Sequence, residues 1–372
     1  MTFSYRFDKA DYLAFHRFRI AGMYMRGGSR VWALRGFALL TFALALIEWY
    51  SGRPSGAAGL AMAGGATLLL PRTYWGLVAG RFRRIVTDPQ NAHLLGRKTL
   101  TLTPEGLHIA DAGEAGYLAW GNIVRAARTE DHIFLVFSTL QAVVIPRASL
   151  EGASFETVWT TATTYLDRHH ERGTRQGSES TATAAIQGTP ASVFSYRLEE
   201  SDWTAFTVHH RRSKAQGRHR WLARFAVLPI PLLLVILGVV RPPVNWDLVV
   251  LFLGLSVLCF LFYPRVLDNA ALRQAEYIAG NSANVHCLGE RRIALSPEWL
   301  HVQGSGVQST FTWPSVVKAE RTDDHIFIYM STSEALIIPR ASLDGASFED
   351  VWTRANEYLD HSRDNPKRQG SA

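Results

Sequence analysis

The feature that most constrains this chain is a twelve-residue stretch that occurs twice. Residues 145–156 read Ile-Pro-Arg-Ala-Ser-Leu-Glu-Gly-Ala-Ser-Phe-Glu, and residues 338–349 repeat them with Asp344 in place of Glu151. The same offset of 193 residues (338 minus 145) superimposes other positions of the two halves. Self-similarity at a fixed offset indicates one structural unit written twice. Each half of the chain therefore predicts the organisation of the other.

The composition favours a chain in which apolar membrane spans alternate with polar modules. Of the 372 residues, 47% are hydrophobic and 19% are charged, and the formal net charge is +7. The basic residues flank the apolar runs, which favours anchoring at a membrane surface and makes nucleic acid an unexpected partner. The two cysteines do not suggest a disulfide framework.

Four apolar runs predict four transmembrane helices arranged as two hairpins. They are residues 32–49, 54–71, 221–240 and 246–263. Each hairpin has one arginine in its short loop, Arg53 or Arg241, and many basic residues on its outer flanks. Because positive residues are retained on the cytoplasmic side, we expect a multi-pass protein of the cytoplasmic membrane with both termini in the cytoplasm.

After each hairpin, short alternating segments predict a small β-sheet module closed by an amphipathic helix. In the first copy, residues 98–103 and 107–109 predict a hairpin, and Ser154 is suited to cap a helix that ends near His169. The fold class is therefore an α+β membrane protein. In the first repeat we expect a strand and a juxtamembrane helix at 1–30, the first transmembrane hairpin at 31–80 and the first module at 81–170. A flexible linker follows at 171–192. In the second repeat we expect a strand and a basic helix at 193–220, the second hairpin at 221–267, the second module at 268–360 and a disordered tail at 361–372.

Three histidines occupy matching positions in the two copies. They are His93, His108 and His132 in the first copy and His286, His301 and His325 in the second. Their spacing matches no compact zinc motif, so we expect no metal site and no cofactor. Asp131 and His132 form a possible catalytic dyad, but Thr-Glu-Asp-His is also good turn chemistry, and no nucleophile elbow accompanies it. We therefore expect a protein that is not an enzyme.

The residues best placed to bind a ligand or a partner are two arginines, two tryptophans and two histidines. They are Arg147, Arg340, Trp120, Trp313, His132 and His325. An arginine between a strand end and a helix start can bind a phosphate or a carboxylate. The alternative for Arg147 is a salt bridge to Glu151 or to the helix of its own module. The alternative for the tryptophans is a place in the core.

The two halves also resemble a known family through a series of short motifs. These are Leu-Thr-Pro-Glu-Gly-Leu at 102–107, Trp-Gly-Asn-Ile at 120–123, Thr-Glu-Asp-His-Ile-Phe at 129–134 and Val-Ile-Pro-Arg at 144–147, with counterparts at 295–300, 313–316, 322–327 and 337–340. In this order the motifs resemble the YcxB-like family of bacterial membrane proteins. The resemblance implies a module similar to pleckstrin-homology-like domains, and it implies no particular reaction. Trp299 replaces Gly106 in the second copy, so the two hairpin turns differ.

Together these observations predict a non-enzymatic protein of the bacterial inner membrane. Beside the lipid bilayer, its duplicated modules would bind a protein partner or anionic lipid headgroups, and the two copies would pair within the chain. The oligomeric state stays open. One alternative is a small transporter or channel built from two repeats. A second alternative is a membrane-bound hydrolase that uses His132 or His325.

Overall fold

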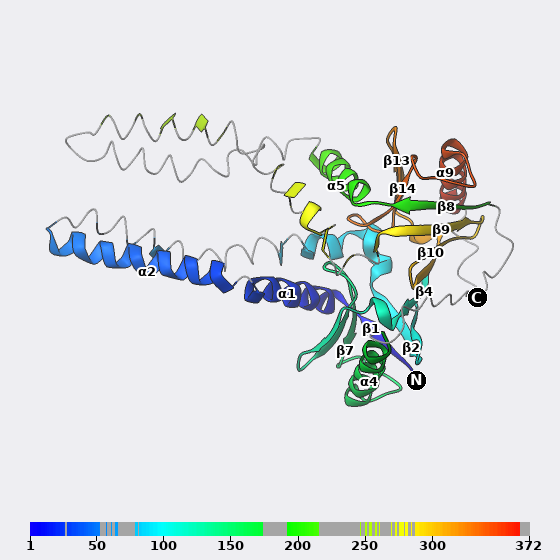
Figure 1. The fold of residues 1–372 in the computed structure, drawn as a ribbon, viewed down its shortest axis with the longest axis horizontal. Coiled ribbons are helices and arrows are strands. Elements are labelled where there is room, and N and C mark those ends of the chain that lie inside the picture. Colours follow the sequence, from blue (N-terminus) through cyan, green and yellow to red (C-terminus); the bar gives the residue numbers. More distant parts are fainter. Residues whose placement is uncertain are drawn as a thin grey trace. The chain divides into compact units, whose positions relative to one another are not determined.

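The chain forms two compact units in a computed structural model (Figure 1). The structure describes residues 1–26, 28–52, 82–173, 192–215 and 287–364, together with isolated positions between 57 and 80 and between 246 and 284. Unit 1 comprises 1–185, 306–317 and 330–334, and unit 2 comprises 186–305, 318–329 and 335–372. Unit 1 thus includes two short segments that come from the second repeat.

The elements follow one another in nearly the same order in the two repeats. The first repeat contains β1 (Thr2–Phe7), α1 (Lys9–Arg26), α2 (Gly28–Tyr50), the short 3-10 helix η1 (Pro89–Leu94), β2 (Gly96–Leu102), β3 (Gly106–Ala110), β4 (Glu114–Ala119), η2 (Trp120–Asn122), β5 (Arg125–Arg128), β6 (His132–Val136), β7 (Ala142–Pro146) and α4 (Phe155–Gly173). The second repeat contains β8 (Ser192–Leu198), α5 (Glu200–Ala215), β9 (Gly289–Leu295), β10 (Trp299–Gly304), β11 (Val307–Thr312), η4 (Trp313–Ser315), β12 (Lys318–Arg321), β13 (His325–Tyr329), β14 (Ala335–Pro339) and α9 (Phe348–Asp364).

Unit 1 consists of two antiparallel sheets closed by the helix α4. One sheet has the strand order β1-β2-β3-β4-β11, and the other has the order β5-β6-β7. Both sheets and α4 contribute to one core, in which Leu100, Trp120, Ile133 and Val158 are fully buried. The alternating pattern of residues 98–109 placed apolar side chains on one face, and the predicted hairpin is confirmed as β2 and β3. The predicted closing helix is confirmed as α4.

The repeated stretch forms a strap along the first strand of each unit. We use the name strap for residues 145–156 in unit 1 and 338–349 in unit 2. The backbone N–H of Ser4 donates to the carbonyl of Glu151 at 3.0 Å, and the N–H of Glu151 donates back to Ser4 at 2.8 Å. Ser195 and Asp344 form the same pair in unit 2, at 2.9 and 2.8 Å. The strap therefore satisfies backbone groups of β1 and β8 that would otherwise lie at a sheet edge.

The end of the strap turns the chain into the closing helix. Gly152 has a φ of +87°, a conformation that costs glycine little, and an added Cβ would lie 3.6 Å from the Cα of Phe3. Two residues later, the hydroxyl of Ser154 accepts a hydrogen bond from the N–H of Thr157 at 3.1 Å. This bond confirms the predicted N-cap. The two straps are nearly identical because each must pair with the first strand, turn at a glycine and cap the closing helix.

The described part of α2 packs through small side chains and turns large ones outward. Ala38 and Ala45 are buried, whereas the large apolar Leu39 and Leu46 are 70% and 61% exposed. A Cβ on Gly64 would lie 2.7 Å from the hydroxyl of Thr41, so the close approach at this point requires glycine.

The four predicted transmembrane helices are contradicted by the structure. Among the residues that it describes, no helix is both long enough and apolar enough to cross a membrane. α2 covers the first predicted span, but Arg35 and Glu48 leave only residues 36–47 uncharged. That run is roughly 18 Å of helix, against a bilayer core of about 30 Å.

This correction extends to the predictions that depended on the spans. The runs 54–71, 221–240 and 246–263 lie outside the described residues, apart from isolated positions, as does most of the predicted linker 171–192. Because no described helix can cross a membrane, the predicted four-span fold class is wrong. The predicted multi-pass location in the bacterial inner membrane, with both termini in the cytoplasm, is wrong for the same reason. The transporter alternative relied on the same four spans.

A buried cluster of charges lies at one end of β2, β3 and β4. Lys98 donates to the carboxylate of Asp111 at 2.5 Å, and the two side chains are 17% and 11% exposed. Burial alone would raise the pKa of Asp111, but the hydrogen bond and charge of Lys98 outweigh it and lower that pKa. Glu114 follows in β4, where burial raises its pKa to about 7, opposed by Lys98 and reinforced by Asp111.

The raised pKa of Glu114 predicts a pH dependence of the stability of unit 1. The folded state holds the proton of Glu114 between pH 4.5, the ordinary value, and about 7, so stability falls as the pH rises through this window. The variant Glu114→Gln carries no titratable group. We expect it to match the wild type near pH 4.5 and to be more stable by about 1 to 3 kcal/mol at pH 8. Urea unfolding followed by circular dichroism at both pH values measures the difference.

The matched control is Glu105→Gln, which removes an exposed carboxylate from the turn between β2 and β3. It should leave the pH profile of the wild type unchanged. Parallel profiles for Glu114→Gln and the wild type would contradict the prediction.

Candidate functional site

In both units the repeated histidine is hydrogen-bonded to an aspartate of the first helix. The Nε2 of His132, at the start of β6, lies 2.9 Å from Oδ1 of Asp11 on α1. In unit 2, Nε2 of His325 lies 2.9 Å from Oδ1 of Asp202 on α5. All four side chains are between 11% and 15% exposed. Each pair therefore joins a helix start to a strand start in a mostly buried place.

The aspartate in each pair also caps its own helix. Oδ2 of Asp11 accepts a hydrogen bond from the N–H of Asp8 at 2.8 Å, and Oδ1 of Asp8 accepts one from the N–H of Asp11 at 3.1 Å. This reciprocal arrangement is a capping box. In unit 2, Oδ2 of Asp202 accepts from the N–H of Glu199 at 2.8 Å. Both carboxylate oxygens are thus used, and each pair ties the start of a helix to the start of a strand.

The neighbouring Asp131 is not the carboxylate that faces His132. The carbonyl of Asp131 accepts a hydrogen bond from the backbone N–H of Arg147 at 2.8 Å, while the ring of His132 is bonded to Asp11, 121 residues away. The adjacency of Asp131 and His132 therefore reflects a turn. A signal for the actual partner was present, because Asp11 and Asp202 follow the matching Phe-Ser-Tyr-Arg segments at the same distance.

Trp120 and Trp313 lie in the interior. Their exposed fractions are 0% and 1%. The indole N–H of Trp120 donates to the carbonyl of Thr103 at 2.8 Å, which ties η2 to the turn of the first hairpin. Side chains buried to this extent do not present a surface to a ligand, and they account for packing.

Arg147 and Arg340, by contrast, lie at the surface, each over an aromatic ring of the closing helix. The guanidinium carbon of Arg147 lies 4.2 Å from the ring centre of Phe155, and that of Arg340 lies 4.0 Å from Phe348. The side chains are 47% and 48% exposed. The nearest carboxylate is Glu156 or Glu349, at 3.8 or 3.7 Å, so the predicted alternative of a bridge to the module's own helix holds only as a long contact.

A second arginine, which the sequence motifs did not single out, completes the arrangement in each unit. Arg128 bonds Oε2 of Glu156 at 2.6 Å, and its guanidinium carbon lies 5.5 Å from the ring centre of Trp159. In unit 2, Arg321 forms the same contacts with Glu349, at 2.6 Å, and with Trp352, at 5.4 Å. The matching offset of Arg128 and Arg321 was the available signal.

We call each of these groups an arginine cluster. In unit 1 it consists of Arg128, Arg147, Phe155, Glu156 and Trp159, and in unit 2 of Arg321, Arg340, Phe348, Glu349 and Trp352. Two guanidinium groups share one carboxylate at the first turn of a long helix, so each cluster keeps an excess positive charge. Guanidinium groups bind carboxylates and phosphates through paired N–H donors, and ring contacts hold them in a defined orientation.

The other repeated histidines are spread over separate places. His93 lies in η1, and His108 lies on β3 with its ring centre 4.9 Å from that of Tyr117. His301 is mostly buried, and burial lowers its pKa. His286 lies outside the described residues. Within the described ranges, no group of three His, Cys, Asp or Glu side chains could hold a metal ion.

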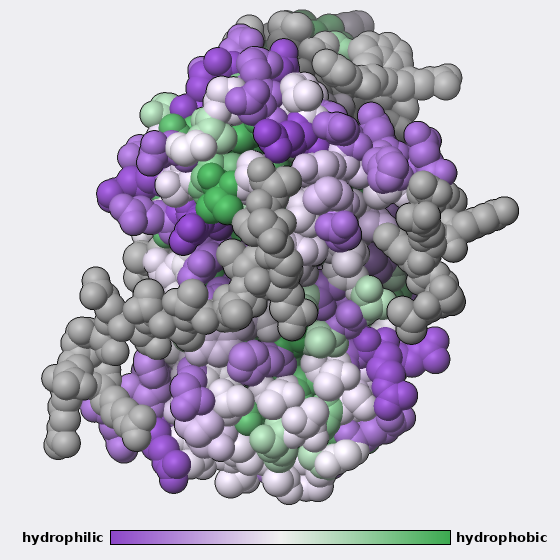
Figure 2. Space-filling view, turned by 90° about the vertical axis from the view of Figure 1, so that its right-hand side faces the viewer, coloured by the Kyte–Doolittle hydropathy of each residue, from purple (hydrophilic) through white to green (hydrophobic). Residues whose placement is uncertain are grey.

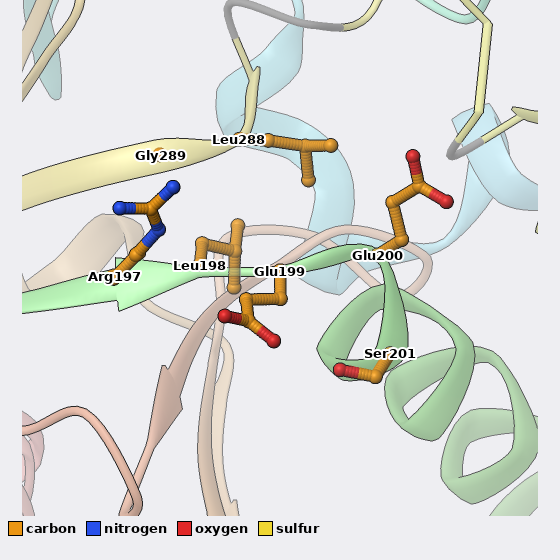
Figure 3. Close-up of a pocket in the computed structure, with 7 residues that line it drawn as sticks. All are labelled: Arg197, Leu198, Glu199, Glu200, Ser201, Leu288 and Gly289. Atoms are coloured by element: carbon orange, nitrogen blue, oxygen red, sulfur yellow. The ribbon is translucent and has the colours of Figure 1, made fainter.

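Unit 2 also has a shallow depression of about 470 Å³ where β8 runs into α5. Figure 3 shows its lining: Arg197, Leu198, Glu199, Glu200, Ser201, Leu288 and Gly289. The acidic side chains of Glu199 and Glu200 point in opposite directions in this view. Acidic groups at the first turn of a helix are favourable for the helix itself, so the depression is explained by the helix start.

Comparison with protein families finds one family model that matches a segment of each repeat. The model of the YcxB-like protein family matches residues 102–158 and again residues 295–351. These segments run from the first hairpin of each repeat to the first turn of its closing helix, and they include both arginine clusters up to Val158 and Val351. No curated protein and no solved structure matches the chain. Through these two tandem segments, the chain is similar to the YcxB-like protein family.

Proposed function

We propose that the protein is a non-enzymatic binding protein whose two arginine clusters each hold an acidic segment of a protein partner. The observation that carries the proposal is the exposure of Arg147 and Arg340 and the contacts of their guanidinium groups. Each is held over a ring, is nearly half exposed, and has its nearest carboxylate at 3.8 or 3.7 Å. The Nε of Arg340 also donates to the carbonyl of Asp323 at 2.6 Å. A guanidinium group has five N–H donors, so these contacts leave donors available for an incoming carboxylate.

The composition of the cluster favours a protein segment over a lipid headgroup. Arginine and tryptophan are enriched at the centres of protein interfaces, and Arg128 lies over the partly exposed Trp159. An acidic segment would meet the excess charge with its carboxylates and the rings with its apolar side chains. Among the coloured residues in Figure 2, hydrophilic and intermediate ones predominate, and hydrophobic ones form smaller areas.

The presence of two clusters in one chain strengthens the proposal. A single exposed ion pair contributes little free energy, so one cluster would bind weakly. Two linked sites raise the overall affinity when one partner carries two acidic segments, because the second contact forms within the complex. The near identity of the clusters fits two sites that recognise the same chemistry.

The proposal predicts a specific effect of removing the two ring-held arginines. The probe is a fluorescently labelled decapeptide rich in Asp and Glu with one Trp. We expect the Arg147→Ala, Arg340→Ala double variant to bind it up to about 5-fold more weakly, since each lost exposed charged contact is worth about 0.2 to 1 kcal/mol. Arg147→Lys with Arg340→Lys should recover only part of the affinity, because lysine keeps the charge without the planar donors. Fluorescence anisotropy measures the binding.

The control is Arg84→Ala with Arg292→Ala, which removes the same net charge from exposed positions before η1 and on β9. An equal loss in the control would show that only net charge matters and would overturn the proposal. Binding of the wild type to phosphatidylglycerol vesicles with no binding to the peptide would point to lipid headgroups in place of a protein segment.

A separate prediction distinguishes a structural His132 from a catalytic one, as the hydrolase alternative requires. We expect His132→Ala to destabilise unit 1 by about 1 to 3 kcal/mol, because Oδ1 of the mostly buried Asp11 loses its partner. Asp11→Asn in the same background should add less than it does alone, since the two residues form one contact. Urea unfolding of the four combinations measures the coupling.

His108→Ala is the control, because it removes an exposed histidine from β3 and should change stability by less than about 0.5 kcal/mol. Additive effects of His132→Ala and Asp11→Asn would contradict the structural role.

A further inference from the structure

The strand β5 lies at the outer edge of the small sheet of unit 1. The order of this sheet is β5-β6-β7, and among the residues that the structure describes no further strand pairs with β5. At the opposite edge, β7 contacts β1 and α1. In unit 2, β12 holds the same edge position in the order β12-β13-β14, and β14 contacts β8 and α5. Within the described ranges, each unit therefore keeps one strand edge that has no partner strand.

The register of β5 determines which of its backbone groups face outward. The turn after β5 is closed by a hydrogen bond from the N–H of Thr129 to the carbonyl of His132 at 2.8 Å. Bonded and non-bonded pairs alternate along an antiparallel ladder. Counting back from this bond, the first and third residues of β5 bond to β6. The N–H and C=O groups of Ala126 and Arg128 therefore point away from the sheet.

The same count applies in unit 2, where the N–H of Thr322 donates to the carbonyl of His325 at 2.8 Å. It leaves the backbone groups of Ala319 and Arg321 on the outer side of β12. Each edge thus presents N–H donors and carbonyl acceptors at the spacing that another strand requires. Because such groups pair with an added strand, the edge is able to bind an extended peptide segment through its backbone.

The arginine cluster lies at the end of this edge. Arg128 is the last residue of β5 and a member of the cluster, so its backbone faces outward while its guanidinium group bonds Glu156 at 2.6 Å. In unit 2, Arg321 joins the edge of β12 to Glu349 in the same way, at 2.6 Å. The closing helix α9 contacts β12 and forms a wall beside the edge. A strand added to either edge would therefore meet the cluster at one end.

Charge favours an acidic segment over a second copy of the same edge. β5 reads Arg-Ala-Ala-Arg and has no acidic residue, so two such edges would bring like charges together. β12 contains Glu320, but its carboxylate is used by Lys318 at 2.6 Å and by His209 at 2.8 Å. In each cluster two arginines share one glutamate, which leaves a positive charge uncompensated. An acidic strand supplies the opposite charge at this position.

We propose that an acidic segment of the partner binds as an added strand along β5 in unit 1 and along β12 in unit 2, with its carboxylates at the arginine cluster. This inference rests on the proposed function and adds that the bound segment is extended. Its backbone bonds the outward groups of Ala126 and Arg128, or those of Ala319 and Arg321. Backbone bonds give such a complex an affinity that a single exposed ion pair does not provide.

Hydrogen exchange of single amides tests the inference, with the acidic decapeptide of the binding assay as the probe. In the free protein we expect the outward amides of Ala126, Arg128, Ala319 and Arg321 to exchange rapidly, because they face no partner strand. With about nine-tenths of the sites filled by peptide, their exchange should slow about 10-fold. The inward amides of the same strands are the matched control and should keep their rates, since they already bond to β6 and β13. Mass spectrometry with single-residue fragmentation measures the rates.

A proline variant tests the same edge through binding. Ala126→Pro with Ala319→Pro removes one outward N–H from each edge, a position at which a strand tolerates proline. We expect the variant to bind the peptide about 5-fold more weakly, which corresponds to the loss of one neutral hydrogen bond, with an unchanged circular dichroism spectrum. Ala126→Ser with Ala319→Ser keeps both N–H groups and should bind as the wild type does.

A peptide that binds through Arg147 and Arg340 without slowing the exchange of the outward amides would overturn the inference and leave the proposed function in place. Equal slowing of inward and outward amides, or unchanged binding by the folded proline variant, would overturn it as well. A wild type that does not bind the peptide would overturn the proposed function and this inference together. If the proline variant does not fold, the exchange rates of the wild type still decide between these outcomes.

Discussion

Each unit depends on the backbone pairing between its first strand and the strap. β1 lies between β2 and the strap, and the two hydrogen bonds of Ser4 and Glu151 connect residues that are 147 positions apart in the chain. Backbone donors and acceptors must find partners when they are buried. The pairing thereby makes the N-terminal strand part of the unit. It also fixes the strap, from whose start Arg147 projects and at whose end α4 begins.

The arginine cluster follows from this constraint. Because the strap runs directly from the end of β7 to the cap of α4, Arg147 comes to lie over Phe155, the first residue of the helix. β5 ends with Arg128, which reaches the same Glu156. The site is thus assembled by the geometry of a strand end and a helix start, and the same geometry recurs in unit 2 at closely matching distances.

Local patterns predicted the elements that form through local contacts. The alternation at 98–109 and the Ser154 cap each act over a few residues, and each led to the observed element. Contacts between distant segments left no such pattern, so the Asp11–His132 pair and the role of Arg128 were missed. The first span was overpredicted because Arg35 and Glu48 were accepted as residues at the membrane interface, although the uncharged run between them is short.

The differences between the repeats are as informative as their identities. The arginine clusters are the same in both, which suits two sites of one specificity. Around β4 and its counterpart β11, the repeats differ: Lys98, Asp111 and Glu114 in the first correspond to Arg291, Gly304 and Val307 in the second. In the ladder of β4 with β11, Leu118 therefore lies opposite the apolar Val307, whereas Glu114 lies opposite Phe311. Divergence thus removes the charged residue at one end of the ladder only, while the arginine clusters stay alike.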